Sequence, residues 1–433
     1  MVEEMFPSWI KKRKRDPRST VVENKSTKRR KRTNTSWSSS KWSELQPELL
    51  EMIIKRLSFV GMLRFKAVCS SWNSIARSYA ASIINQTPWL TLPSDDDHTR
   101  RFYSLEEKKV YTVKNSFQDF PGASWCVGSS HGWLVILDDP NNIPHLFNPI
   151  SENRSMELPH IPSTTNSLLG SPPFYHVAKA VLSSDPSCNN NFSAAIIYGI
   201  QPSRLAFYNH GDEEWTDLNG EHQEYCDIIF HNDKLFALAD NGCVEAWDFR
   251  KPSPKKIINL QPASAKELDL DYTSNRDKFS TNTYLVESSD EIMSVVRCIG
   301  NFVNEEGKAI HEIDVPDEPY SPCPYRTLQF YVFKLNFAAN KWEKVECLPN
   351  CALFLGGSQS ISLSTKDVSG CEENSIYFTD DRWDEIELLG DTDSYGGHDM
   401  GVYNLEDKVV KQFYPFDKWR IDPPPFWIVP SPW

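Results

Sequence analysis

The first regular pattern along the chain is helical and occupies residues 42–79. Leu50, Ile53, Ile54 and Leu57 recur at the i, i+3, i+4, i+7 spacing that lines up side chains on one face of a helix. Pro47 stands near the start of this stripe, where a helix tolerates a residue without an N–H group. Two shorter apolar patterns follow, over residues 63–68 and 69–75. The spacing predicts three short helices, close to the lower size limit for an independent core. Many of their apolar side chains should therefore need a partner.

Beyond residue 85 the helical period disappears and short β-type runs replace it. Of the 29 prolines, 26 lie beyond residue 80, a density that interrupts helices and marks turns. Several runs are apolar on both faces, which is typical of strands covered on both sides by other sheets. The runs are residues 133–137, 194–198, 235–238, 243–249, 328–335 and 375–378.

A loose repeat joins these runs: a strand, a polar turn and a short segment with an apolar residue. Six such hairpins centre near residues 102, 147, 207, 247, 333 and 402. A propeller blade repeats about every 40–50 residues, so the longer intervals require loop insertions. The pattern predicts a mostly β fold, a β-propeller of about six blades, with five to seven left open. A two-sheet sandwich is the alternative, although it rarely needs this much chain. Residues 255–325 are polar and weakly patterned.

The helical stretch resembles the F-box, a module that docks substrate receptors onto the adaptor of SCF-type ubiquitin ligases. The matching segments are residues 42–50 (Trp-Ser-Glu-Leu-Gln-Pro-Glu-Leu-Leu) and 64–72 (Arg-Phe-Lys-Ala-Val-Cys-Ser-Ser-Trp). The family usually has proline where Gln46 stands. The resemblance implies an F-box at residues 41–84 that binds a Skp-family adaptor and, through it, a cullin. A helical cap packed on the chain's own propeller is the structural alternative. The residues expected to contact the adaptor are Leu45, Pro47, Leu49, Leu50, Ile53, Leu57, Val68 and Trp72.

The remainder of the chain, residues 88–433, resembles a plant family of kelch-like β-propeller domains of unknown function that follow F-boxes. The resemblance is carried by residues 128–135 (Gly-Ser-Ser-His-Gly-Trp-Leu-Val), 374–381 (Asn-Ser-Ile-Tyr-Phe-Thr-Asp-Asp) and 401–408 (Gly-Val-Tyr-Asn-Leu-Glu-Asp-Lys). The resemblance implies that this domain presents a protein target. The Trp- and Pro-rich stretch 413–433 can close the ring with one last strand or recognise a partner, and we expect ring closure.

The net charge of −13 combines two opposite parts. Residues 1–40 carry 12 basic and 4 acidic residues, whereas the remainder carries 34 and 55. The segment lacks apolar periodicity, so we expect a disordered tail. Its basic clusters predict a signal read by an import receptor, and hence a nuclear location. An acidic body is a poor binder of nucleic acid, and no apolar run is long enough to span a membrane. The clusters are Lys11, Lys12, Arg13, Lys14 and Arg15, then Lys28, Arg29, Arg30, Lys31 and Arg32.

Motifs for chemistry are weak. Residues 128–132 satisfy G-x-S-x-G, but a nucleophile elbow needs a helix after Ser130, and a β-type run follows. The ten cysteines form no CxxC pair, so we expect core thiols and no metal site. Asp380, Asp381, Asp384 and Glu385 form an acidic cluster that we expect to be a solvated loop. No cofactor is predicted.

These expectations converge on a non-catalytic nuclear substrate receptor of an SCF-type ubiquitin ligase, in which the propeller binds a protein target. The main alternative is a nuclear interaction scaffold with no ligase role. An enzyme using the central pocket of the propeller is a further alternative, which the lack of clustered ligand residues disfavours.

Overall fold

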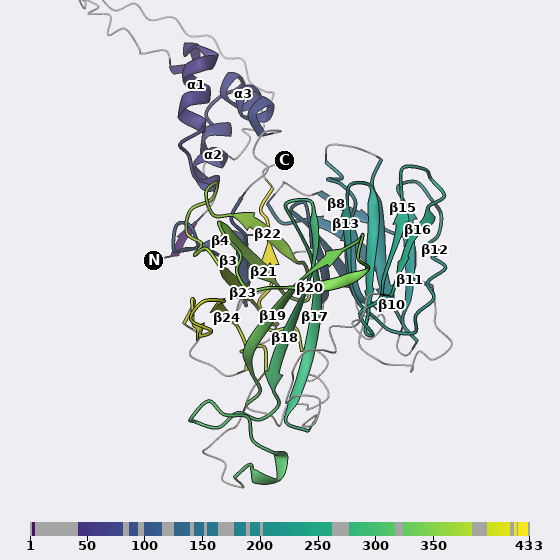
Figure 1. The fold of residues 1–433 in the computed structure, drawn as a ribbon. Helices are drawn as coiled ribbons and strands as arrows, with labels where there is room; N and C mark the ends of the chain where they lie inside the picture. The colour runs from purple at the N-terminus through teal and green to yellow at the C-terminus, as the bar shows by residue number, and fades with distance from the viewer. Residues whose placement is uncertain are drawn as a thin grey trace, which may run out of the picture. The chain divides into compact units, whose positions relative to one another are not determined.

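The computed structural model describes a helical unit and a β unit (Figure 1). It describes residues 2–4, 42–80, 86–93, 99–114, 125–138, 143–150, 154–162, 177–187, 191–199, 202–261, 277–316, 324–382, 396–415, 420–421 and 423–431. Within these ranges, no helix combines the length and hydropathy of a membrane-spanning segment.

The helical unit confirms the three predicted helices. Pro47 takes the first helical position of α1, and the Ser58 side chain caps α2 by accepting a hydrogen bond from the Gly61 N–H at 3.3 Å. The Phe65 and Trp72 rings, 4.4 Å apart, join α2 to α3. The elements are η1 (Trp42–Glu44), α1 (Pro47–Ile54), α2 (Phe59–Lys66) and α3 (Ser70–Ala80).

The β unit is a six-bladed propeller, as the hairpin repeat predicts (Figure 1). Its described strands form six sheets, and one strand of each sheet lies beside the corresponding strands of the neighbouring blades to form the inner ring. The inner strands approach closely: a Cβ at Gly128 would lie 2.2 Å from the carbonyl oxygen of Ala180 in the next blade. Blades 2 to 5 are simple antiparallel meanders, read here from the inner strand outward. Blade 2 contains β5 (Trp125–Ser130), β6 (Trp133–Asp138), β7 (Ile143–Asn148) and β8 (Arg154–Glu157); blade 3 contains β9 (Val177–Leu182), β10 (Ser193–Tyr198), β11 (Arg204–Asn209) and β12 (Thr216–Asp217). Blade 4 contains β13 (Tyr225–His231), β14 (Lys234–Ala239), β15 (Val244–Asp248) and β16 (Lys255–Leu260); blade 5 contains β17 (Phe279–Ser288), β18 (Glu291–Gly300), β19 (Arg326–Asn336) and β20 (Lys341–Val345).

Blade 6 departs from the meander. The chain enters at its second strand, turns inward to the inner strand, and then returns to the third, so β21 and β23 pair in parallel. The strands are β22 (Ile361–Ser364), β21 (Cys351–Leu355), β23 (Ser375–Phe378), β24 (Gly401–Asn404) and β25 (Val410–Lys411), from the inside outward.

Blade 1 closes the ring, as expected for the C-terminal stretch. Its inner strand β26 comes from the end of the chain and pairs antiparallel with β2 from the start of the propeller. The Thr91 N–H also donates to the Phe426 carbonyl at 2.9 Å. Blade 1 contains β26 (Trp427–Ile428), β2 (Trp89–Leu92), β3 (Thr99–Ser104) and β4 (Lys109–Lys114), with β1 (Val2–Glu4) at its outer edge. The expectation of disorder for residues 1–40 does not hold for β1, and residues 5–40 lie outside the described ranges.

The closing strand is held by a buried tryptophan, which gives a testable prediction. The indole N–H of Trp427 donates to the Leu355 carbonyl of blade 6 at 3.1 Å, and its ring contacts Phe354 edge-on. Trp427→Phe keeps most of the apolar contact but leaves that carbonyl without its donor. The free energy of unfolding, measured in urea, should fall by about 1–2 kcal/mol. An unchanged unfolding midpoint would show that this bond contributes nothing to closure.

Candidate adaptor-docking surface and buried charge networks

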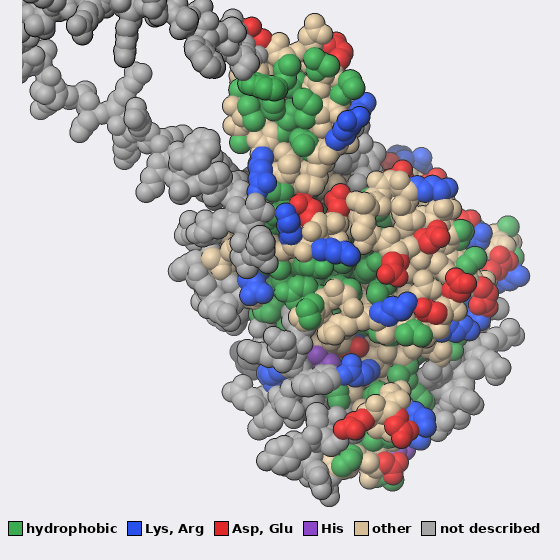
Figure 2. Space-filling view, turned by 90° about the vertical axis from the view of Figure 1, so that its left-hand side faces the viewer, with side chains coloured by type: hydrophobic (Ala, Val, Ile, Leu, Met, Phe, Trp, Pro, Cys, Tyr) green, Lys and Arg blue, Asp and Glu red, His purple; other side chains and the backbone are tan. Residues whose placement is uncertain are grey.

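Helix α1 presents apolar side chains on two opposite sides. Leu50 and Ile54 are buried. Leu49, Met52 and Ile53, spaced at i, i+3 and i+4, are exposed by 46%, 57% and 36% of their surface. Hydrophobic side chains gather visibly on the helical unit (Figure 2). An exposed apolar stripe of this kind is typical of a protein-binding surface.

The predicted adaptor-binding residues divide into three groups. Pro47, Leu49, Ile53 and Val68 are exposed. Leu45, Leu57 and Trp72 are partly buried. Leu50 is fully buried, so the prediction that it contacts an adaptor is wrong, and its side chain serves packing. The helical period alone could not separate Leu50 from Leu49, because both neighbours lie on apolar faces of the same helix.

Two further exposed side chains belong to this surface and were not predicted. Met52 completes the α1 stripe, and Trp42 is 63% exposed at the start of the unit. The Trp72 indole N–H donates to the Trp42 carbonyl at 3.0 Å, which fixes the backbone that carries Trp42. Their signal in the sequence was the position of Met52 three residues after Leu49 and the opening tryptophan of the motif. The predicted nuclear-import clusters, residues 11–15 and 28–32, lie outside the described residues.

The centre of the propeller contains a buried ion pair between inner strands. Lys179 of β9 pairs with Asp227 of β13, and both side chains are almost fully buried. The Asp227 carboxylate also accepts from the Leu285 N–H of β17 at 2.8 Å and from the Ser360 hydroxyl at 3.4 Å. One carboxylate therefore links the inner parts of blades 3, 4, 5 and 6.

The segment that leads into β22 fills the same region. The Ser358 carbonyl accepts from the Ser129 N–H of blade 2 at 3.0 Å, and the Ser358 hydroxyl donates to the Trp427 carbonyl of blade 1 at 3.3 Å. Residues 358–360 thus contact the inner strands of blades 1, 2 and 4. Polar groups of the protein occupy this level of the axis, and they bind one another.

The central pair predicts a pH-dependent stability. Burial raises the pKa of Asp227 above its ordinary 3.8, and Lys179 opposes that rise. Lys179→Met removes the opposing charge, so the folded state binds a proton that the unfolded state releases. The free energy of unfolding should therefore fall as the pH rises through the raised pKa, with a limiting slope of about 1.4 kcal/mol per pH unit.

Urea unfolding of this variant at several pH values between about 5 and 8 tests the slope against that of the wild type. Lys334→Met is the matched control, because Lys334 pairs with Glu291 at the surface, at 2.8 Å. Parallel curves for Lys179→Met and wild type would contradict the proposed coupling.

A second buried network surrounds Arg297 of β18, whose side chain is fully buried. Its guanidinium donates to the carboxylates of Asp381 and Asp399 at 3.1 and 2.8 Å and to the Thr379 carbonyl at 2.8 Å. The Thr327 hydroxyl accepts from its Nε at 2.7 Å. The network joins β18 and β19 of blade 5 to the two ends of the β23–β24 connection.

This network corrects the interpretation of the acidic cluster. Asp380 is fully buried and Asp381 nearly so, which contradicts the expected solvated loop. The Asp380 carboxylate accepts from the Tyr325 hydroxyl at 2.7 Å and the Asp399 N–H at 3.0 Å. Burial, and then the charge of Asp399, raise the pKa of Asp380. Asp384 and Glu385 lie outside the described residues.

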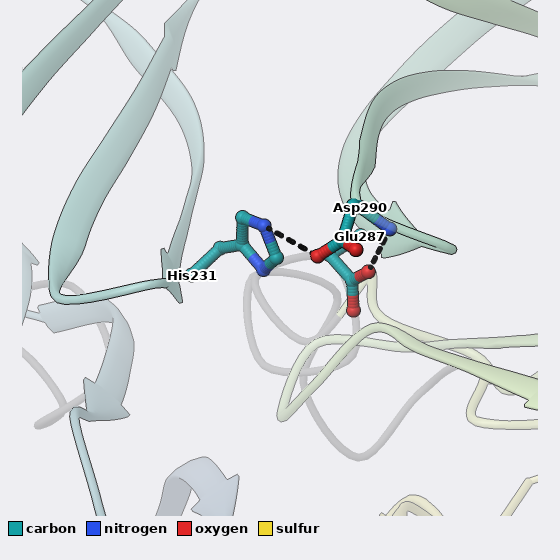
Figure 3. A group of neighbouring side chains, drawn as sticks. All are labelled: His231, Glu287 and Asp290. Atoms are coloured by element: carbon teal, nitrogen blue, oxygen red, sulfur yellow. Dashed lines mark hydrogen bonds and ion pairs between the residues drawn. The ribbon is translucent and has the colours of Figure 1, made fainter.

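One group of side chains has the composition of a metal site. His231, at the end of β13, faces Glu287 and Asp290 at the β17–β18 turn, and the three ligand atoms lie within 4.8 Å of one another (Figure 3). Glu287 accepts from the Asp290 N–H at 2.8 Å, and the His231 imidazole lies 3.6 Å from the Asp290 carboxylate. These contacts account for the group as a meeting of two hairpin turns from adjacent blades.

The G-x-S-x-G segment has the structure of a hairpin. Ser130 ends β5, His131 and Gly132 form a turn with φ of 54° and 82°, and β6 follows. Two successive residues with positive φ are typical of a tight β-hairpin turn. The strand–turn–helix geometry of a nucleophile elbow is therefore not formed at Ser130.

Comparisons with known proteins agree with both units. Residues 42–80 match the F-box domain model, and residues 102–404 match the KIB1-4 beta-propeller model. The Arabidopsis thaliana protein At4g17565 is 29% identical over 348 residues, which cover 78% of this chain and 83% of that protein. The F-box/kelch-repeat protein KIB1 of the same plant is 26% identical over 384 residues and 86% of each chain. The chain is an F-box protein and belongs to the KIB1-4 β-propeller family.

Proposed function

We propose that this protein is a non-catalytic substrate-recognition subunit of an SCF-type ubiquitin ligase. The observation that carries the proposal is the exposed apolar stripe of Leu49, Met52 and Ile53 on a helical unit that matches the F-box. Helices that bind in a groove of a partner present anchors at this spacing. A Skp-family adaptor is the partner that an F-box implies, and a cullin would follow through the adaptor.

The proposed mechanism is proximity. The propeller would hold a target protein, and the F-box would connect it to the machinery that carries activated ubiquitin. Joining two binding modules in one chain raises the local concentration of the target lysine at the transfer site, so no catalytic residue is required of this chain. Loops at the blade ends are the recognition elements most often found on rigid scaffolds of this kind.

Affinity purification of the full chain, with and without residues 42–80, tests this function. The adaptor and cullin should co-purify only when these residues are present, whereas targets bound to the propeller should co-purify in both cases. Recovery of propeller partners without any adaptor would favour an interaction scaffold with no role in ubiquitin transfer.

We further propose that the protein acts in the nucleus. The support is the pair of basic clusters at residues 11–15 and 28–32, a pattern that suits the acidic groove of an import receptor. A fluorescent reporter fused to residues 1–40 should accumulate in nuclei, and replacing both clusters by glutamine should abolish this. A cytoplasmic signal from the intact segment would contradict the proposal.

A further inference from the structure

A structured projection extends from blade 5 between β18 and β19, at the lower end of the propeller in Figure 1. Residues 301–316 fold back on themselves through a bridge between Val303 and Ala309. The Ile310 N–H donates to the Phe302 carbonyl at 2.9 Å, and the Val303 side chain is buried. These bonds give the projection a defined shape, so little conformational entropy is lost when it binds.

The projection presents an isoleucine to solvent. Ile313 lies in the short helix η4 (Glu312–Asp314) and is 84% exposed, more than any other large hydrophobic residue in the described part of the chain. A backbone hydrogen bond of 2.9 Å from the Asp314 N–H to the His311 carbonyl holds this turn. A side chain of this size, fixed and uncovered, is typical of a binding anchor.

Carboxylates surround the isoleucine in the sequence and on the surface. Glu312 and Asp314 flank it, and Glu305 and Glu306 lie at the other end of the projection; all four are exposed. Lys308 is the one lysine or arginine within residues 301–316 and pairs with Glu306 at 3.1 Å. The projection therefore carries a net charge of −3. Acidic side chains gather at the lower end of the molecule in Figure 2.

The base of the projection is anchored by the Arg297 network. Tyr325 and Thr327, at the start of β19, bind the carboxylates of Asp380 and Asp399. These bonds fix where the chain returns from the projection to the blade. The projection is thus a rigid outgrowth of the propeller and not an independent loop.

We propose that this projection is the surface that binds the target protein, and that it takes a segment in which lysine or arginine residues surround an apolar side chain. The apolar side chain would cover Ile313, and the basic residues would pair with the carboxylates on either side of it. The inference rests on the proposed function, because it names the part of the propeller that takes the target. Nucleic acid and anionic lipid headgroups are repelled by the same carboxylates.

Fluorescence anisotropy on the purified full chain tests the proposal. The probe is a fluorescein-labelled peptide, Gly-Lys-Arg-Leu-Lys-Leu-Arg-Lys-Gly, in buffer with EDTA at physiological salt. Ile313→Ser alone, and Glu312→Gln with Asp314→Asn, should each raise the Kd about tenfold, the effect of losing one good contact. The matched controls are Val409→Ser, at an exposed apolar site on blade 6, and Glu213→Gln with Glu214→Gln, at an exposed acidic turn on blade 3.

The control variants should bind the probe as the wild type does, and a peptide with glutamate at every basic position should not bind. Equal loss in the projection and control variants would overturn the proposal, since the acidic body as a whole would then be the binding surface. Absence of probe binding to the wild type would overturn it as well. Capture of the adaptor by the same preparations distinguishes these failures from a failure of the proposed ligase function.

Discussion

Replacing both Leu49 and Ile53 by aspartate is expected to lower the affinity for an SCF adaptor by at least about 100-fold. Each exposed aliphatic side chain that a partner buries contributes about 1.5–3 kcal/mol, and a charge placed at the same contact adds a desolvation cost. Two such changes together exceed the ~2.7 kcal/mol that corresponds to a factor of 100. Pull-down with purified adaptor, followed by titration calorimetry, measures the loss.

The matched control for this prediction is Ile257→Asp with Val409→Asp, which changes two exposed apolar residues of the propeller. That variant should bind the adaptor as the wild type does. Circular dichroism should show unchanged helix content in both variants, because Leu49 and Ile53 lie on the exposed side of α1. Full adaptor binding by the Leu49/Ile53 variant would show that this stripe is not the docking surface.

Arg297→Met should destabilise the propeller at or above the upper end of the about 3–5 kcal/mol that breaking a buried ion pair costs. The reason is the number of groups that depend on this side chain. The charge of Arg297 offsets the buried carboxylates of Asp381 and Asp399, and its charge also acts on Asp380. Its removal leaves negative charge inside the protein with no counter-charge at hydrogen-bonding distance. Urea unfolding followed by tryptophan fluorescence measures the change.

Two variants frame this result. Arg297→Lys keeps the charge, but an ammonium group cannot reproduce the planar set of bonds to Thr327, Thr379 and Asp399, so an intermediate loss is expected. Arg250→Met removes an arginine that pairs with Asp248 at the surface, and should cost less than about 1 kcal/mol. Equal stability of the Arg297 and Arg250 variants would contradict the account of the network.

Much of the fold could be predicted because its signals are local. The α1 stripe and the opening motif define the helical unit, and the runs at residues 133–137, 194–198 and 235–238 all lie in strands. Strands covered on both faces are apolar throughout, so they are visible without knowledge of their neighbours. The hairpin spacing then gave about six blades, and the structure has six.

The least patterned segment was the one the sequence could not resolve. Residues 255–325 contain β17 and β18, two ten-residue strands. The first half of β17, with Ser280, Thr281, Asn282 and Thr283, is only partly buried or exposed, so its residues are polar and give no hydrophobic signal. Cross-strand hydrogen bonds with β18 stabilise it, and pairing of this kind depends on another part of the chain.

The buried charges were missed for a related reason. Arg297 and Asp399 are 102 residues apart in the sequence, and Lys179 and Asp227 are separated by most of blade 3. An acidic residue is exposed in most proteins, so Asp380 and Asp381 predict a solvated loop unless a buried arginine is known to face them. No local pattern reveals such a partner. The same limit applies to Leu50 and Leu49, whose different exposure follows from how α1 packs.

The position of β26 has a consequence for synthesis on the ribosome. The first blade to be translated receives its inner strand from Trp427 and Ile428, which are translated after all the other strands. Until they emerge, β2 retains an unpaired edge, the kind of edge that invites pairing with other chains. A nascent chain stalled before residue 427 would therefore be an open, aggregation-prone ring, so the half-life of truncated translation products should depend on chaperones that cover strand edges.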